Sequence, residues 1–207
     1  MNYRTLPTPD RLRRTIEAVQ TRGVTVALVE TKESALTQLQ ALIPAGATVM
    51  TGSSITLQQI GLEALLISGK HPWRNLKDEI VAEKDRARQS VLRKQATLAD
   101  YFLGSVHAIA ETGEIIIASA TGSQLPAYAY SSSNVIWVAG TQKITPTVEA
   151  ALQRVRDYVL PLEDQRMKQV YGNEAGSIVG KLLVFEREAP YLHRSVNLLL
   201  VNEVLGF

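Results

Sequence analysis

The chain has 207 residues, of which 45% are hydrophobic and 20% charged, and its formal net charge is +2. These values are typical of a globular protein, and so small a net charge gives no reason to expect a nucleic-acid partner. The chain contains no cysteine, which excludes disulfides, thiolate catalysis and cysteine-ligated zinc or iron–sulfur clusters within it. At this length we predict that residues 1–207 form one domain.

The apolar segments bear on the location of the protein. The N-terminal sequence MNYRTLPTPDRLRRT lacks the apolar core of a signal peptide. No uninterrupted apolar run approaches the roughly 20 residues that span a membrane. We therefore expect a cytoplasmic protein that has no membrane partner.

The first third of the chain predicts alternating helices and strands. Capping residues and apolar spacing place helices at 9–22, 32–43 and 55–68, the last with a break at Gly61, and strands at 24–29 and 48–50. This order is typical of an α/β fold, a largely parallel open sheet with helices on both faces.

The following elements are predicted in the same way. The charged segment from Asp78 to Leu98 predicts one long helix, whose charges face solvent or, alternatively, form a basic binding strip. After residue 123 we predict a Tyr- and Ser-rich loop, a strand, a helix that Pro161 interrupts, and two closing strands; their ranges are 126–134, 135–139, 145–170, 182–185 and 196–201.

The stretch from Ala99 to Ser123 is the centre of the predicted site. One apolar piece ends at Gly104, and a β-branched run begins at Ile115, so two buried strands frame a polar corner. Open α/β sheets bind ligands where their strands end. We expect this corner to form a crevice together with two other loops that follow strands.

The first of those loops contains Gly52, Ser53, Ser54 and Thr56, between a predicted strand and a helix. Free backbone N–H groups and hydroxyls at such a position suit a phosphate or a carboxylate. The alternative is that a serine only caps the helix. In the second loop, Thr141 and Lys143 follow the strand 135–139, and the lysine would neutralise an anionic substrate or simply be solvated.

Glu111 is the candidate catalytic residue, and Thr112 and Gly113 beside it complete the predicted ligand-binding set with Gly104. The carboxylate could act as a general base, a nucleophile or an acceptor for substrate hydroxyls, or it could serve only in a turn. His107 is interpreted as a partly buried polar contact. No histidine has a metal-ligand spacing, so we predict no metal and no cofactor.

Several short motifs carry a family resemblance. The most specific is Ala-Ile-Ala-Glu-Thr-Gly at 108–113. The others are Gly-Ser-Ser-x-Thr-Leu at 52–57, Gly-Leu at 61–62, Ala-Asp at 99–100, VIWVAG at 135–140 and Val-Asn-Glu-x-x-Gly at 201–206. Together they resemble the LUD domain, the lactate-utilisation domain that was formerly a domain of unknown function, over nearly the whole chain from Thr8 to Phe207.

The resemblance implies a fold like that of ribose-5-phosphate isomerase, glucosamine-phosphate deaminase and CoA transferases, which bind phosphate-bearing or acyl substrates in loops after the sheet strands. It also implies a role in the oxidation of L-lactate to pyruvate, with iron–sulfur subunits as partners. Because this chain has no cysteine to hold a cluster, it is similar to the cluster-free subunit of such a complex.

Three functions remain as alternatives. The first is an accessory component of lactate oxidation that binds a small carboxylate or a partner subunit, with Glu111 orienting the ligand. The second is an enzyme that acts on a CoA thioester or a sugar phosphate, with Glu111 as base or nucleophile. The third is a non-catalytic interaction module. A homo-oligomer is a further alternative, because four aromatic residues could contribute to an interface: Trp73, Trp137, Tyr128 and Tyr130.

Overall fold

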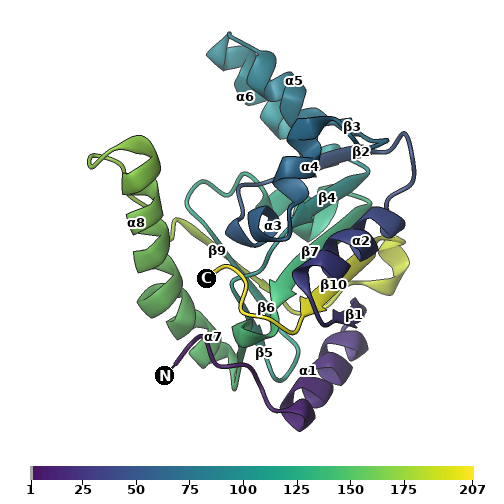
Figure 1. Cartoon of the computed structure of the whole chain (residues 1–207), viewed down its shortest axis with the longest axis vertical. Helices are drawn as coiled ribbons and strands as arrows, with labels where there is room; N and C mark the ends of the chain where they lie inside the picture. Colours follow the sequence, from purple (N-terminus) through teal and green to yellow (C-terminus); the bar gives the residue numbers. More distant parts are fainter. Residues whose placement is uncertain (1) are drawn as a thin grey trace.

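The computed structural model describes residues 2–207 and is built on two sheets (Figure 1). The main sheet has six parallel strands in the order β1-β10-β7-β4-β2-β3. They are β1 (Thr25–Val29), β2 (Thr48–Thr51), β3 (Arg74–Asn75), β4 (Tyr101–Gly104), β7 (Asn134–Gly140) and β10 (Ser195–Val201). The predicted α/β class with a largely parallel sheet is therefore confirmed.

The second sheet has four strands in the order β8-β5-β6-β9. They are β5 (Ala108–Ala110), β6 (Ile115–Ser119), β8 (Ile144–Thr145) and β9 (Lys181–Phe185). β6 is antiparallel to both its neighbours, and β8 joins β5 in parallel. The two predicted closing strands, β9 and β10, thus lie in different sheets.

Both faces of the main sheet are buried, as its central strand β7 illustrates. Val135, Trp137 and Ala139 pack into one hydrophobic core, whereas Ile136 and Val138, which alternate with them, pack into another. Successive side chains of a strand point to opposite faces, so a strand covered on both sides is apolar without interruption. This is why the run VIWVA predicts a central strand correctly.

Helices and the second sheet form the covering layers. α1 (Pro9–Thr21) and the inner face of the second sheet enclose the first core. α2 (Lys32–Leu42), α3 (Ile55–Gln59) and α4 (Leu62–Ser68) cover the opposite face of the main sheet. α7 (Val148–Arg154) covers the outer face of the second sheet. Short 3₁₀ turns complete the chain at η1 (Ala96–Leu98), η3 (Thr141–Lys143) and η5 (Pro190–Leu192).

The prediction of one long helix over 78–98 is wrong. The segment forms two helices, α5 (Leu76–Ala82) and α6 (Arg86–Gln95), which lie side by side (Figure 1). Asp85 starts the second helix, because its carboxylate accepts the backbone N–H of Ala87 at 2.9 Å. Gln89 then donates to the carbonyl of Ile80 at 2.9 Å and fixes the turn. Asp85, an N-cap residue within the charged segment, therefore determines where the first helix ends and the second begins.

The predicted interruption at Pro161 is also wrong. α7 continues through a π-helical turn, η4 (Val155–Val159), into α8 (Leu160–Tyr171). A proline lacks the backbone N–H and crowds the carbonyl four residues earlier, and a wider turn before it relieves both effects. A second such turn, η2 (Ala127–Ser131), lies within the loop predicted at 126–134.

Three of the four aromatic residues expected at an interface are core residues. Trp73, Trp137 and Tyr128 are buried, and only Tyr130 is exposed. Trp137 packs edge to face with Tyr128 at 5.6 Å and with Phe185 at 5.2 Å between ring centroids. Within residues 2–207, no helix is both long and apolar enough to cross a membrane.

Candidate functional site

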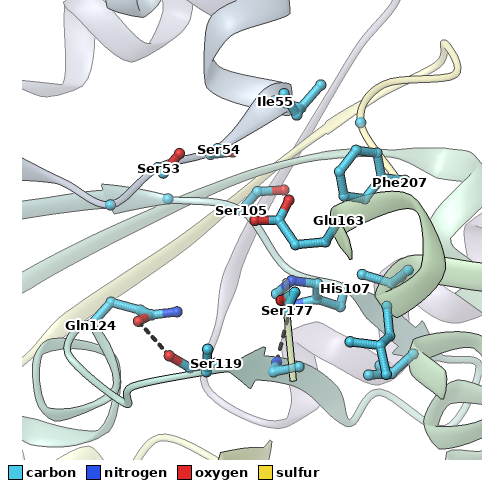
Figure 2. A pocket seen from close by; sticks show the side chains of 18 of the residues that line it. Ser53, Ser54, Ile55, Ser105, His107, Ser119, Gln124, Glu163, Ser177 and Phe207 are labelled. Atoms are coloured by element: carbon cyan, nitrogen blue, oxygen red, sulfur yellow. Dashed lines mark hydrogen bonds between the residues drawn. The ribbon is translucent and has the colours of Figure 1, made fainter. Parts of the chain in front are cut away.

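A cavity of about 480 Å³ opens at the carboxyl ends of β2 and β4 (Figure 2). The loops that follow these strands, and the stretch that follows β6, line one side of the cavity. η4 and α8 line the other side, and the C-terminal residues Gly206 and Phe207 also contribute to the lining. Its size lies in the range of small-molecule sites.

Lys143 is buried at the base of this cavity. Its Nζ lies 3.1 Å from Thr56 Oγ1, 3.1 Å from Ser105 Oγ and 3.0 Å from the carbonyl oxygen of Val106. These groups come from α3, from the loop after β4 and from the 3₁₀ turn after β7. Three segments distant in the sequence therefore converge on one amine.

The amine of Lys143 has no carboxylate to balance its charge. None of the ion pairs among residues 2–207 includes it. Burial, and secondly the positive charge of Arg154, hold the pKa of Lys143 well below its ordinary value. In the free site, burial therefore shifts the equilibrium of Lys143 toward the neutral amine, because an isolated ammonium is costly to bury.

His107 lines the cavity as a neutral ring. Its Nδ1 accepts the backbone N–H of Ala118 at 3.1 Å, which assigns the ring proton to Nε2. Burial first, and then the charges of Lys143 and Arg154, lower the pKa of His107 to about 3. The imidazole therefore serves as an N–H donor near neutral pH.

Arg154 is a second buried cation, behind His107. One Nη1–H donates to the carbonyl of His107, and the guanidinium lies 5.8 Å from the ring centroid of Tyr3 and 5.1 Å from that of Tyr158. Its Nε and Nη2 have no hydrogen-bond partner within residues 2–207. Burial lowers its pKa to about 10, so it stays charged at neutral pH. Arg154 therefore places a buried positive charge behind His107.

The opposite wall carries an ion pair on α8. Arg166 donates to both carboxylate oxygens of Glu163, at 2.6 and 2.7 Å. Figure 2 shows the Glu163 side chain reaching toward Ser105 across the cavity. Glu163 is therefore paired with Arg166 on the same helix while its carboxylate faces the cavity.

Six of the ten predicted site residues line this cavity. They are Gly52, Ser53, Ser54, Thr56, Gly104 and Lys143. Ser54 also caps α3, since its hydroxyl accepts the backbone N–H of Leu57 at 3.3 Å. The expectation that Lys143 is solvated is wrong, and the alternative, a lysine placed to neutralise an anion, fits its position.

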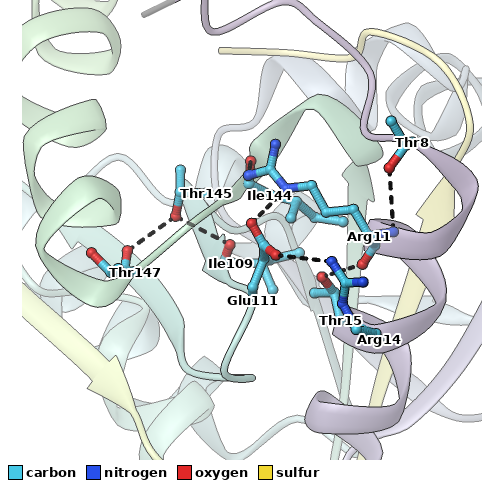
Figure 3. Close-up of polar contacts among 9 residues, drawn as sticks. All are labelled: Thr8, Arg11, Arg14, Thr15, Ile109, Glu111, Ile144, Thr145 and Thr147. Carbon is cyan, nitrogen blue, oxygen red and sulfur yellow. Dashed lines mark hydrogen bonds and ion pairs between the residues drawn. The ribbon is translucent and has the colours of Figure 1, made fainter.

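The structure places Glu111 elsewhere (Figure 3). It lies in the turn between β5 and β6 and pairs with Arg11 at 2.6 Å and with Arg14 at 3.9 Å. Because β5 and β6 form an antiparallel hairpin, this turn is at the opposite end from His107 and Ser119, which line the cavity. The expectation that Glu111 shares the crevice is therefore not met.

The remaining three predicted residues also lie outside the cavity. Thr112 hydrogen-bonds Glu114 in the same hairpin turn, and Gly113 has a φ of +101° against the backbone of Ala18. Thr141 is buried, with its hydroxyl 3.4 Å from the side-chain oxygen of Asn202. These residues have local structural contacts.

Ser105 lies within the predicted crevice segment from Gly104 to Gly113, although it is not among the predicted binding residues. Other lining residues are not predicted at all. Glu163 and Arg166 gave no signal, because a mixed-charge helix is typical of a solvated surface. Within residues 2–207, no group of three or more His, Asp or Glu side chains could hold a metal ion.

The fold and the cavity define an α/β protein that has its site at the strand ends of a parallel sheet. The family model for the LUD domain matches residues 12–173, and the chain therefore belongs to the LUD domain family, which is associated with lactate utilisation. A crystal structure of a DUF162 family protein from Deinococcus radiodurans superposes with a TM-score of 0.52 at 15% identity. The superposition covers 95% of this chain and 98% of that one, and it shows a shared fold. No curated protein matches the chain.

Proposed function

We propose that this protein acts in lactate utilisation by binding a small carboxylate, such as lactate or pyruvate, in the cavity above Lys143. The observation that carries the proposal is the buried amine of Lys143, cradled by Thr56 and Ser105 and without a carboxylate partner among residues 2–207. A carboxylate ligand would supply the missing negative charge. The membership of the LUD domain family supports the choice of ligand class.

Binding would be coupled to protonation of Lys143. A carboxylate within hydrogen-bond distance favours the ammonium form and raises the pKa of the lysine again. The hydroxyls of Thr56 and Ser105 and the neutral His107 then offer polar contacts for the second oxygen and for a 2-hydroxyl or 2-oxo group. We therefore expect the protein to take up a proton as the anion binds.

The oxidation itself would need a partner. The conversion of lactate to pyruvate releases two electrons, and this chain has no cysteine with which to hold an iron–sulfur cluster. In this proposal the protein is the cluster-free component that presents the carboxylate, and iron–sulfur subunits receive the electrons. Glu111 has no part in it, because its carboxylate is paired with Arg11 outside the cavity.

Calorimetric titration with L-lactate, D-lactate, pyruvate and acetate tests the proposal. The wild type should bind at least one of them, with proton uptake that appears as a dependence of the measured heat on the buffer. Lys143→Met should abolish binding, whereas the exposed Lys32→Met should not. Equal affinity of Lys143→Met and the wild type would reject the carboxylate site. Recovery of iron–sulfur subunits with the tagged protein tests the partner.

A further inference from the structure

The contact between Ser105 and Lys143 has a chemical meaning beyond anion binding. Ser105 Oγ lies 3.1 Å from Lys143 Nζ, and both residues line the cavity. A serine is a weak nucleophile unless a base within hydrogen-bond reach accepts its proton. A neutral lysine at this distance meets that geometric requirement.

Lys143 Nζ donates to three oxygens, and the Ser105 hydroxyl in turn donates to Thr56 Oγ1 at 3.2 Å. The carbonyl oxygen of Val106, at 3.0 Å, can only accept a hydrogen bond, so it takes one N–H of the amine. Thr56 Oγ1, at 3.1 Å, accepts the second N–H. To act as a base, Lys143 must be neutral and the Ser105 hydroxyl must turn its proton from Thr56 to Nζ, which the 3.1 Å between Oγ and Nζ allows by rotation of the hydroxyl alone.

We propose that Ser105 is a nucleophile, that Lys143 is its base, and that the pair catalyses acyl transfer from small esters or thioesters. Ser105 Oγ bonds to the acyl carbon while its proton moves to Lys143 Nζ. The carbon–oxygen or carbon–sulfur bond to the leaving group then breaks, and Lys143 returns the proton to the departing alkoxide or thiolate. Water, deprotonated in turn by Lys143, releases the acid from the acyl-serine and restores both residues.

In this proposal His107 is the donor to the charge that develops on the acyl oxygen. The neutral ring of His107 carries its proton on Nε2 and lines the same cavity two residues after Ser105. The acid that the reaction releases is a small carboxylate, so the product is of the same class as the ligand proposed above. The nucleophile itself does not depend on that proposal, since an ester carries no charge at the reacting group.

Labelling with a fluorophosphonate probe, which phosphonylates activated serines, tests the proposal. The wild type should gain the mass of one phosphonyl group, and peptide mapping should place it on Ser105. Ser105→Ala should not react. Lys143→Met should react at least about 100-fold more slowly, the usual scale for loss of a general base. Ser90→Ala, a serine on the exposed face of α6, should label like the wild type.

The pH profile separates a nucleophile from a merely accessible hydroxyl. Hydrolysis of 4-nitrophenyl acetate should accelerate as Lys143 loses its proton and should reach its plateau below the ordinary pKa of lysine. This measurement uses the wild type, so it holds even if Lys143→Met does not fold. Absence of phosphonylation at Ser105 across the neutral and alkaline range would overturn the proposal. Carboxylate binding that persists in that case would leave the proposed function intact.

Discussion

Arg11 and Glu111 form an ion pair of 2.6 Å that joins α1 to the turn of the β5–β6 hairpin. Both side chains are about three-quarters buried, with exposed fractions of 29% and 25%. Arg11 also donates to the carbonyl of Ile144 at 3.3 Å, which ties β8 to the same contact. This pair holds the second sheet against α1, and its position gives Glu111 a structural role.

Glu111→Gln should therefore lower stability and leave ligand binding unchanged. The amide keeps one hydrogen bond to Arg11 but loses the charge, so we expect a loss of about 1 kcal/mol in the free energy of unfolding. Urea unfolding measures this loss, and titration with the carboxylate that the wild type binds measures the affinity. A tenfold loss of affinity with unchanged stability would contradict the structural role.

The sequence indicates the main sheet well and the second sheet poorly, for a physical reason. β7 is buried on both faces and is therefore a continuous apolar run, so 135–139 agrees closely with β7 (Asn134–Gly140). The apolar run 24–29 likewise agrees with β1 (Thr25–Val29), an edge strand whose residues are half-buried or exposed. An apolar run does not reveal which sheet it joins. The two strands predicted on either side of the polar corner, one ending at Gly104 and one beginning at Ile115, lie in different sheets, as β4 of the main sheet and β6 of the second.

The same reason explains which parts of the site could be predicted. The loops after β2 and β7 were identified because each follows a strand of the parallel sheet, where such sheets place ligands. Glu111 follows β5, a strand of the second sheet that carries its turn away from the cavity. The lowered pKa of Lys143 results from burial by distant segments, which no local pattern contains.

His107 should make the protein sensitive to acid. Its pKa is about 6.5 in the unfolded chain and about 3 in the folded protein, so between these values the unfolded state binds the extra proton. Stability should therefore fall as the pH decreases from about 6.5 toward about 3. Denaturant titrations across this range should give a shallower decline for His107→Gln than for the wild type. Parallel curves would show that the ring titrates normally.

Lys143 should make stability depend on pH in a second range, at alkaline pH, where stability again rises with pH. Its pKa is near 10.5 when unfolded and well below that value when folded, so the unfolded chain binds more protons between the two. The wild type should therefore gain stability relative to Lys143→Met as the pH rises toward 10.5, by at most about 1.4 kcal/mol per pH unit. The difference between the two unfolding curves removes the contribution of all other lysines. A difference that is independent of pH would mean that Lys143 is charged when folded.

Gly206 should couple the C-terminal residues to the ligand site. Its φ is +61°, and a Cβ there would meet the hydroxyl of Thr56 and lie 3.2 Å from Lys143 Nζ. Gly206→Ala should therefore cost about 1 kcal/mol for the left-handed backbone and should also displace the contacts of Lys143. Gly46→Ala is the matched control, because Gly46 has a φ of +81° and no atom within 4 Å of the added Cβ.

Both variants should lose stability in urea, because both force an alanine into the left-handed region, and Gly206→Ala should lose more because its methyl group also meets the hydroxyl of Thr56. Only Gly206→Ala should weaken carboxylate binding and slow the phosphonylation of Ser105. Only its methyl group would displace the hydrogen bond between Thr56 and Lys143. Equal affinity and equal labelling of the two variants would mean that binding and labelling do not depend on the contact between Thr56 and Lys143. The C-terminal residues would then cover the cavity without controlling its chemistry.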